Sequence, residues 1–266
     1  MKKTRDRNGF DEVVWRGLVS VLWLYLLFCW AGFAFGGAAK TLPPCDFDDH
    51  WRSGRRQLAD EVPMDARMDR LAERSTGAFD FYRVSFATFG RRVQGVMSVP
   101  TDKAKFPCPV VVRVSTGAAD TMTGDANVIK VQFSTSSRKE DFSSDLLGID
   151  RAVDWIVSRS EVDWHRFWYQ GAPKDGDFGV CLVGLNQAFT RAVLFAPVEL
   201  NGCACITNFA SRITCPVRVV VNSSGAACSS NSVFSVFNSL GSLDKAIFND
   251  AADGKPCEWL RAARGD

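Results

Sequence analysis

Residues 162–197 decide the fold, and they read VDWHRFWYQGAPKDGDFGVCLVGLNQAFTRAVLFAP. The aromatic run 167–169 predicts a short strand, and the glycine-flanked residues 171–176 predict a tight turn. The apolar run 178–185 predicts a buried helix, and 192–196 predicts a second buried strand. A strand, a turn, a helix and a strand in this order are typical of an α/β sheet.

The rest of the chain from residue 40 onward shows the same alternation. Residues 80–87 and 93–99, on either side of a Gly-Arg-Arg turn, predict an opening β-hairpin. Further buried strands are predicted at 109–114, 128–133, 215–222 and 245–248, and helices at 46–62, 143–158 and 230–240. Ser143 is the expected N-cap of its helix. The pattern predicts an α/β fold with a doubly wound, mostly parallel sheet, formed by one domain at residues 40–266.

The first 39 residues form a separate segment. Residues 1–16 are rich in Lys and Arg, whereas residues 17–39 carry no charge and are long enough to span a bilayer. The segment ends in Gly-Gly-Ala-Ala, which suits cleavage by a signal peptidase. Two interpretations stay open, a cleaved signal peptide and an uncleaved membrane anchor. Both predict that the remaining chain is extracytoplasmic, either secreted or periplasmic, or held at the membrane by residues 17–39.

The composition excludes several classes of function. A net charge of +2, from 32 basic and 30 acidic side chains, gives no basis for nucleic-acid binding. The only histidines are His50 and His165, so a histidine-based site has few candidates. Cys203, Cys205 and Cys215 lack a fourth ligand at zinc spacing. Neither a metal nor a cofactor is expected.

The surroundings of three cysteines predict whether their thiols are buried. Cys108, Cys181 and Cys215 lie in or beside apolar segments. Thiols in such surroundings behave as small hydrophobic side chains, so these three are expected to be buried.

Five segments match a known family in order and spacing: LPPCDFDDHW at 42–51, YRVSFATFGRRVQGVMSVP at 82–100, and residues 150–163, 208–217 and 233–238. In these segments the chain resembles the acetyl xylan esterase and cephalosporin C deacetylase family of α/β-hydrolases. The resemblance implies an α/β-hydrolase-like fold and an ancestry among enzymes that remove acetyl groups from xylan-type polysaccharides. It therefore implies an acetylated polysaccharide or oligosaccharide as a partner.

The residues that would perform this chemistry are substituted. Such an esterase needs a serine nucleophile, a histidine base and an aspartate that orients the histidine. The family's nucleophile turn is similar to Gly-Gly-Ser-Gln-Gly-Gly, whereas this chain has Gly-Ala-Pro-Lys-Asp-Gly with Pro173 at the serine position. The acid position holds Gly225, and the base position falls near Ala252, where there is no histidine. The resemblance therefore implies a catalytically inactive relative.

Two connections are short compared with the family. Residues 134–142 replace a long loop that helps the family to assemble, and only residues 198–207 stand where the family has a lid over its pocket. The lid region is thus expected to be largely missing. Neither the family's pocket nor its oligomer can be transferred to this chain.

Two alternatives to an inactive esterase remain. An active ester hydrolase could use a non-standard serine site, with Lys174 and either Ser223 or Ser224 near the strand ends where such sheets bind ligands. A carbohydrate-binding or protein-interaction module is the other alternative, and it rests on analogy with the fold.

Overall fold

The computed structural model describes residues 44–116, 122–136, 138–172, 175–195, 206–221, 230–249 and 259–260. The chain divides into two units, Met1–Thr41 and Leu42–Asp266, and all described residues belong to the second. The N-terminal segment lies outside the described residues, so its assignment as a signal or an anchor stays a prediction. Within the described ranges, no helix has the length and apolarity needed to cross a membrane.

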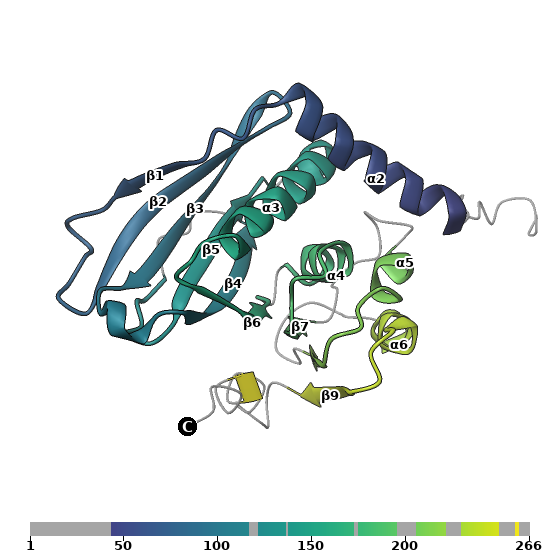
Figure 1. The fold of residues 1–266 in the computed structure, drawn as a ribbon. Coiled ribbons are helices and arrows are strands. Elements are labelled where there is room, and N and C mark those ends of the chain that lie inside the picture. Colours follow the sequence, from purple (N-terminus) through teal and green to yellow (C-terminus); the bar gives the residue numbers. More distant parts are fainter. Residues whose placement is uncertain are drawn as a thin grey trace, which may run out of the picture. The chain divides into compact units, whose positions relative to one another are not determined.

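The described part of the chain forms a nine-stranded sheet with the order β1-β2-β3-β5-β4-β6-β7-β8-β9 (Figure 1). Its strands are β1 (Arg67–Arg70), β2 (Phe79–Thr88), β3 (Arg91–Pro100), β4 (Cys108–Thr116), β5 (Ile129–Thr135), β6 (Val162–Gln170), β7 (Arg191–Phe195), β8 (Val217–Val221) and β9 (Lys245–Asn249). The pairs β1–β2, β2–β3 and β3–β5 are antiparallel, and all other pairs are parallel. The six strands from β4 to β9 therefore all have their C-terminal ends on the same side of the sheet, which is called the carboxyl edge.

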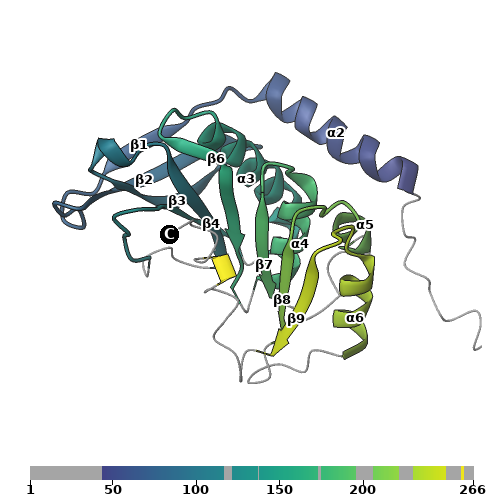
Figure 2. The ribbon, with the colours of Figure 1, turned by 60° about the horizontal axis from the view of Figure 1, so that its bottom comes forward.

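Helices cover one face of this sheet. They are α2 (Pro44–Glu61), α3 (Phe142–Val157), α4 (Gly176–Leu185), α5 (Ile206–Ala210) and α6 (Ser230–Ser239), with short 3-10 turns at Lys103–Lys105 and Lys139–Asp141. In Figure 2, α3 to α6 lie along one side of the strands, and α2 lies outside α3. The β6–α4–β7 unit is the strand, turn, helix and strand predicted from residues 162–197.

Alternate residues of the central strands belong to two different cores. Val110 and Tyr169 point into the large core beneath the helices. Val111 and Trp168, their neighbours in sequence, point to the opposite face. There they pack around Leu260, which is 4% exposed. The helical residues Trp259 and Leu260 thus cover part of the face opposite α3 to α6.

The predicted fold class is confirmed, and each predicted strand and helix is present with shifted ends. The hairpin turns at Gly90, whose φ of 65° favours glycine. The expected cap of α3 is wrong, because Ser143 lies inside the helix and Asp141 occupies the N-cap without a side-chain cap bond. Two elements were not predicted: β1 is charged without an apolar alternation, and α5 has only five residues.

Candidate functional site

The turn between β6 and α4 lies where a serine hydrolase of this type carries its nucleophile. Pro173 and Lys174 lie outside the described residues, but the residues on both sides are described. The Gly171 N–H donates to the Val193 carbonyl oxygen at 2.8 Å, and the Asp175 N–H donates to the Ala172 carbonyl oxygen at 3.1 Å. The chain therefore leaves β6 and enters α4 through a short turn at the carboxyl edge of the sheet.

The other predicted site positions follow two strands that end at the same edge. Ser223, Ser224 and Gly225 come directly after β8, and Ala252 follows β9. All four lie outside the described residues, so their roles stay predictions. Because β6, β8 and β9 are connected by parallel pairing through β7, the chain emerges from all three strands at the carboxyl edge. The described ends of these three strands therefore lie at the edge where ligands of such sheets bind.

A buried carboxylate is the main described feature of this edge. The Asp175 side chain is 6% exposed and immediately precedes α4. Its Oδ1 accepts a hydrogen bond from the Thr116 N–H at 3.0 Å, and a second one from the Thr116 hydroxyl. Thr116 is the last residue of β4. This contact links residues 59 positions apart in the sequence, so no local pattern could have predicted it.

Tyr169 lies beneath the same edge and is not suited to act as a nucleophile. Its side chain is fully buried, and its hydroxyl has no hydrogen-bond partner among the described atoms. A Cβ added at Gly179 would lie 2.8 Å from this hydroxyl, so helix and ring are in close contact. Burial raises the pKa of the Tyr169 phenol, and the carboxylate of Asp175 raises it further. The phenol therefore stays protonated at neutral pH.

Neither of the two described histidines lies at the carboxyl edge. His165 is exposed at the amino-terminal half of β6, where its ring lies against Trp164. His50 is exposed on α2. Within the described ranges, no group of three His, Cys, Asp or Glu side chains could hold a metal ion. The base position near Ala252 lies outside the described residues, so the absence of a histidine base stays a prediction.

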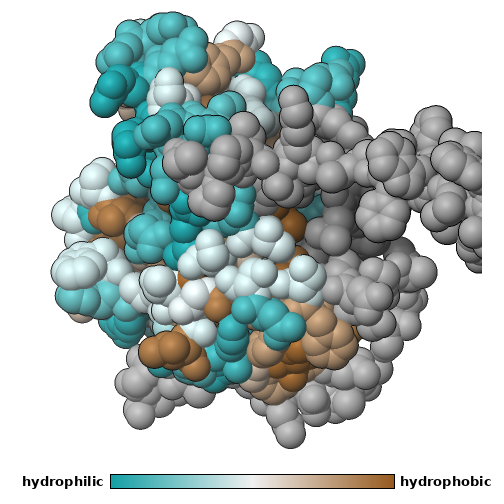
Figure 3. Space-filling model, turned by 90° about the vertical axis from the view of Figure 1, so that its right-hand side faces the viewer, coloured by the Kyte–Doolittle hydropathy of each residue, from teal (hydrophilic) through white to brown (hydrophobic). Residues whose placement is uncertain are grey.

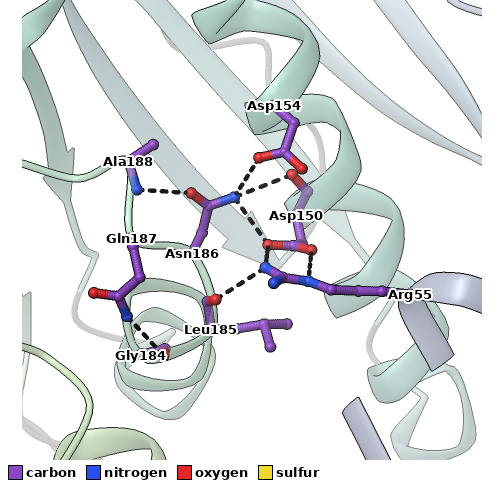
Figure 4. Close-up of polar contacts among 8 residues, drawn as sticks. All are labelled: Arg55, Asp150, Asp154, Gly184, Leu185, Asn186, Gln187 and Ala188. Carbon is purple, nitrogen blue, oxygen red and sulfur yellow. Dashed lines mark hydrogen bonds and ion pairs between the residues drawn. The ribbon is translucent and has the colours of Figure 1, made fainter. Parts of the chain in front are cut away.

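A polar network holds α2 against the far end of α4 (Figure 4). Arg55 donates to both carboxylate oxygens of Asp150, at 2.7 and 2.5 Å, and to the Leu185 carbonyl oxygen at 2.9 Å. The Asn186 amide donates to Asp150 at 2.9 Å and to Asp154 at 3.0 Å. Asp150 is 2% exposed, so this network neutralises a buried charge. Its role is to dock the helix.

Two of the hollows among the described residues lie away from the carboxyl edge. One of about 320 Å³ lies between α2 and the end of α4 and includes Trp51, Arg55 and Arg212 in its lining. The other, of about 230 Å³, is lined in part by Tyr82 and Arg159. Neither hollow includes Thr116, Gln170, Gly171 or Asp175.

Comparison of the sequence and the fold with known proteins shows which proteins this chain is similar to. No model of a known protein family matches the sequence. The acetyl esterase Axe7A of Xylanibacter ruminicola is 22% identical over an alignment that covers 74% of this chain and 60% of that protein. An acetyl xylan esterase from Paenibacillus sp. R4 superposes with a TM-score of 0.68 and 15% identity, over 82% of this chain and 94% of that one. The chain has the acetyl xylan esterase fold.

A second solved structure supports the same relationship. Acetyl xylan esterase 1 from Thermoanaerobacterium sp. JW/SL YS485 also gives a TM-score of 0.68, with 14% identity over 83% of this chain and 94% of that one. The predicted resemblance to this group of α/β-hydrolases is therefore confirmed. The chain spans only 60% of the length of the Axe7A relative, so that protein's activity is not transferred with the fold.

Proposed function

We propose that this chain is a carbohydrate-esterase-like protein that does not hydrolyse acetyl esters, a non-catalytic relative of the acetyl xylan esterases. The observation that carries this proposal is the contact between Asp175 and Thr116 at the carboxyl edge. The sequence supports it independently, because Pro173, Gly225 and Ala252 fall at or near the positions of nucleophile, acid and base.

The contact opposes ester hydrolysis for an electrostatic reason. In α/β-hydrolases the oxyanion of the intermediate is bound by the N–H after the nucleophile and by an N–H of the loop after an earlier strand. Here that loop follows β4, and the N–H of Thr116, the last strand residue before the loop, donates to Asp175. Two negative charges about 4 Å apart repel each other by about 4 kcal/mol at an effective dielectric constant of 20. A carboxylate beside the turn would therefore disfavour the charge that the reaction must create.

We propose acetylated polysaccharide as the ligand class. The support is the activity of the similar proteins, two acetyl xylan esterases and an acetyl esterase. The charge-free residues 17–39, if they direct export, would place this domain outside the cytoplasm, where polysaccharides occur. Binding without turnover would give the domain a carbohydrate-recognition role.

Acetate release tests the absence of catalysis. The full chain is incubated with an aryl acetate and with acetylated xylo-oligosaccharide, beside the Thermoanaerobacterium esterase as a positive control. We expect no release above buffer from this chain. The Pro173→Ser variant is expected to stay inactive too, because a serine alone has neither a base nor an acid.

Turnover that a serine-directed reagent abolishes would contradict the proposal. The variants Lys174→Ala, Ser223→Ala and Ser224→Ala would then locate the non-standard serine site. Calorimetric titration with acetylated and deacetylated xylo-oligosaccharides tests the ligand separately. We expect the chain to bind the acetylated oligosaccharide and not the deacetylated one. Equal binding of both oligosaccharides, or binding of neither, would reject this ligand class without affecting the conclusion on catalysis.

A further inference from the structure

We propose that two copies of this chain associate through the outer edge of β9, as a twofold-symmetric dimer in which the two sheets become continuous. β9 is the last strand of the described sheet, and β8 pairs with one side of it only. An edge strand presents unpaired N–H and C=O groups that readily accept another strand. This inference is independent of whether the chain hydrolyses esters.

The two edges of the sheet differ in their protection against such pairing. β1, at the opposite edge, has the sequence Arg-Met-Asp-Arg, and both its arginines form ion pairs, Arg67 with Asp65 and Arg70 with Asp80. Self-pairing of β1 in antiparallel orientation would place Arg67 opposite the partner's Arg70, and like charges opposite each other are destabilising. Natural sheets use such charges to prevent association at an edge. β1 is therefore a protected edge.

β9 lacks this protection. Its sequence is Lys-Ala-Ile-Phe-Asn, in which Lys245 is the only charged residue. The Lys245 ammonium points back to its own molecule, because it donates to the Leu240 carbonyl oxygen at 2.9 Å and lies 5.3 Å from the centre of the Phe237 ring on α6. β9 therefore differs from β1 because its single charge would not lie opposite a like charge in a self-paired strand.

The backbone of β9 fixes which groups are available. The Val217 N–H of β8 donates to the Asp244 carbonyl oxygen at 2.9 Å. In a parallel ladder, every second residue of a strand bonds to the same neighbour. Ala246 and Phe248 therefore direct their N–H and C=O groups toward β8, whereas Lys245 and Ile247 direct theirs to the open edge.

This arrangement makes β9 complementary to a second copy of itself. With the twofold axis at Ile247, this residue faces the partner's Ile247 as a hydrogen-bonded pair, and Ala246 faces the partner's Phe248. Lys245 faces the partner's Asn249, so no like charges meet. A strand that is self-complementary in this way suits an isologous interface.

Apolar side chains beside β9 extend the contact surface. Leu243, two residues before the strand, is fully exposed, and Phe234 on α6 is 53% exposed. Phe234 lies one turn before Phe237, which contacts Lys245. Figure 3 shows hydrophobic surface in the lower half of the face on this side of the molecule, the level of α6 and β9 in Figure 1. Burying these side chains would add to the strand pairing.

Site-specific cross-linking tests the dimer and its register. In the Ile247→Cys variant of the full chain, the two thiols would sit on a hydrogen-bonded pair with Cα atoms about 5.5 Å apart, within disulfide range. In the matched Lys245→Cys variant they would be about 14 Å apart along the strands. Mild oxidation is expected to give a reducible dimer for Ile247→Cys only, with the unsubstituted chain as the control for native cysteines. Equal cross-linking of both variants, or none, would overturn the proposal.

The Ile247→Pro variant tests the edge in a second way. Proline removes an outward N–H, which edge strands tolerate, and it also replaces the Ile247 side chain that packs against the core. The unsubstituted chain and this variant are sedimented in one detergent-containing buffer. We expect a dimer for the unsubstituted chain and a monomer for the variant, with the same circular dichroism spectrum for both. The proposal would be overturned if the unsubstituted chain were a monomer at all concentrations. This result is expected if another segment or another protein covers β9. A dimer that persists in the folded variant would also overturn the proposal.

Discussion

The carboxylate of Asp175 shows how one residue alters what a turn can do. The family's turn has glycine at this position, whereas here a buried side chain joins the end of β4 to the start of α4. A negative charge at a helix N-terminus is favourable, because it complements the helix dipole. Under the proposed function, the same charge that stabilises the fold would oppose an oxyanion.

A double-mutant cycle at Asp175 and Thr116 measures this contact. We expect Asp175→Ala and Thr116→Val to be coupled by about 1–2 kcal/mol in the free energy of unfolding, because a hydrogen bond to a charged group is removed. The matched cycle at Arg52 and Asp49, an ion pair with 68% and 76% exposed side chains, is expected to give less than about 0.5 kcal/mol. Urea unfolding provides both values. Equal coupling in the two cycles would show that the Asp175 contact is not specific.

The pKa of the Cys215 thiol gives a test of how deeply this side chain is buried. Cys108 and Cys181 are fully buried, as expected, and Cys215 is partly buried. Burial raises the pKa of the Cys215 thiol to about 11. Only the thiolate reacts with alkylating reagents, so at pH 8 we expect Cys215 to be modified about 100-fold more slowly in the native chain than after unfolding.

Peptide mapping by mass spectrometry after timed iodoacetamide treatment checks this rate. Because the raised pKa favours the neutral thiol, the native rate should increase as the pH rises toward 11. A native rate at pH 8 that matches the unfolded rate would mean that the thiol is not desolvated.

At the scale of elements, α4 depends on glycines for close packing. A Cβ at Gly184 would lie 2.3 Å from the Phe209 carbonyl oxygen of α5. The two backbones therefore meet without a side chain between them. This close approach brings α5 against α4, and the Arg55 network holds α2 at the same end of α4.

The Gly184→Ala variant tests this approach. Alanine normally stabilises a helix relative to glycine, but here the clash with α5 is expected to dominate and to destabilise the fold by about 1–3 kcal/mol. Gly77→Ala is the matched control, because nothing lies within 4 Å of its added Cβ. Thermal unfolding should show a lower Tm for Gly184→Ala only. A raised Tm would show that α5 can move away from α4.

At the scale of the whole described domain, the face of the sheet opposite α3 to α6 is covered in part by the helical residues Trp259 and Leu260. Leu260 packs with Val111, Trp168, Val193 and Val220. The rings and charges beside it reinforce the contact, because the guanidinium groups of Arg191 and Arg218 lie 5.0 and 4.3 Å from the centre of the Trp259 ring.

The Leu260→Ala variant tests how much this segment contributes. Removing a buried leucine side chain is expected to cost about 2–4 kcal/mol in unfolding free energy. Met64→Ala, at a side chain that is 38% exposed, is the control and should change it by less than about 1 kcal/mol. Chemical denaturation measures both. An effect at Leu260 no larger than at Met64 would mean that the sheet does not need this cover.

The sequence by itself determined the order and type of the main elements, the parallel sheet and the relationship to the acetyl xylan esterases. These features are local, because apolar alternation and turn residues act over a few positions. The sequence also predicts that Pro173 stands at the nucleophile position, and this stays a prediction because residue 173 lies outside the described residues. β1 could not be predicted, since its charged residues become a strand only by pairing with β2. Tertiary structure alone decided the pairing of Asp175 with Thr116 and the docking of Leu260, because each contact brings together residues distant in the sequence. It also decided the strand order, which makes β9 the last strand of the described sheet.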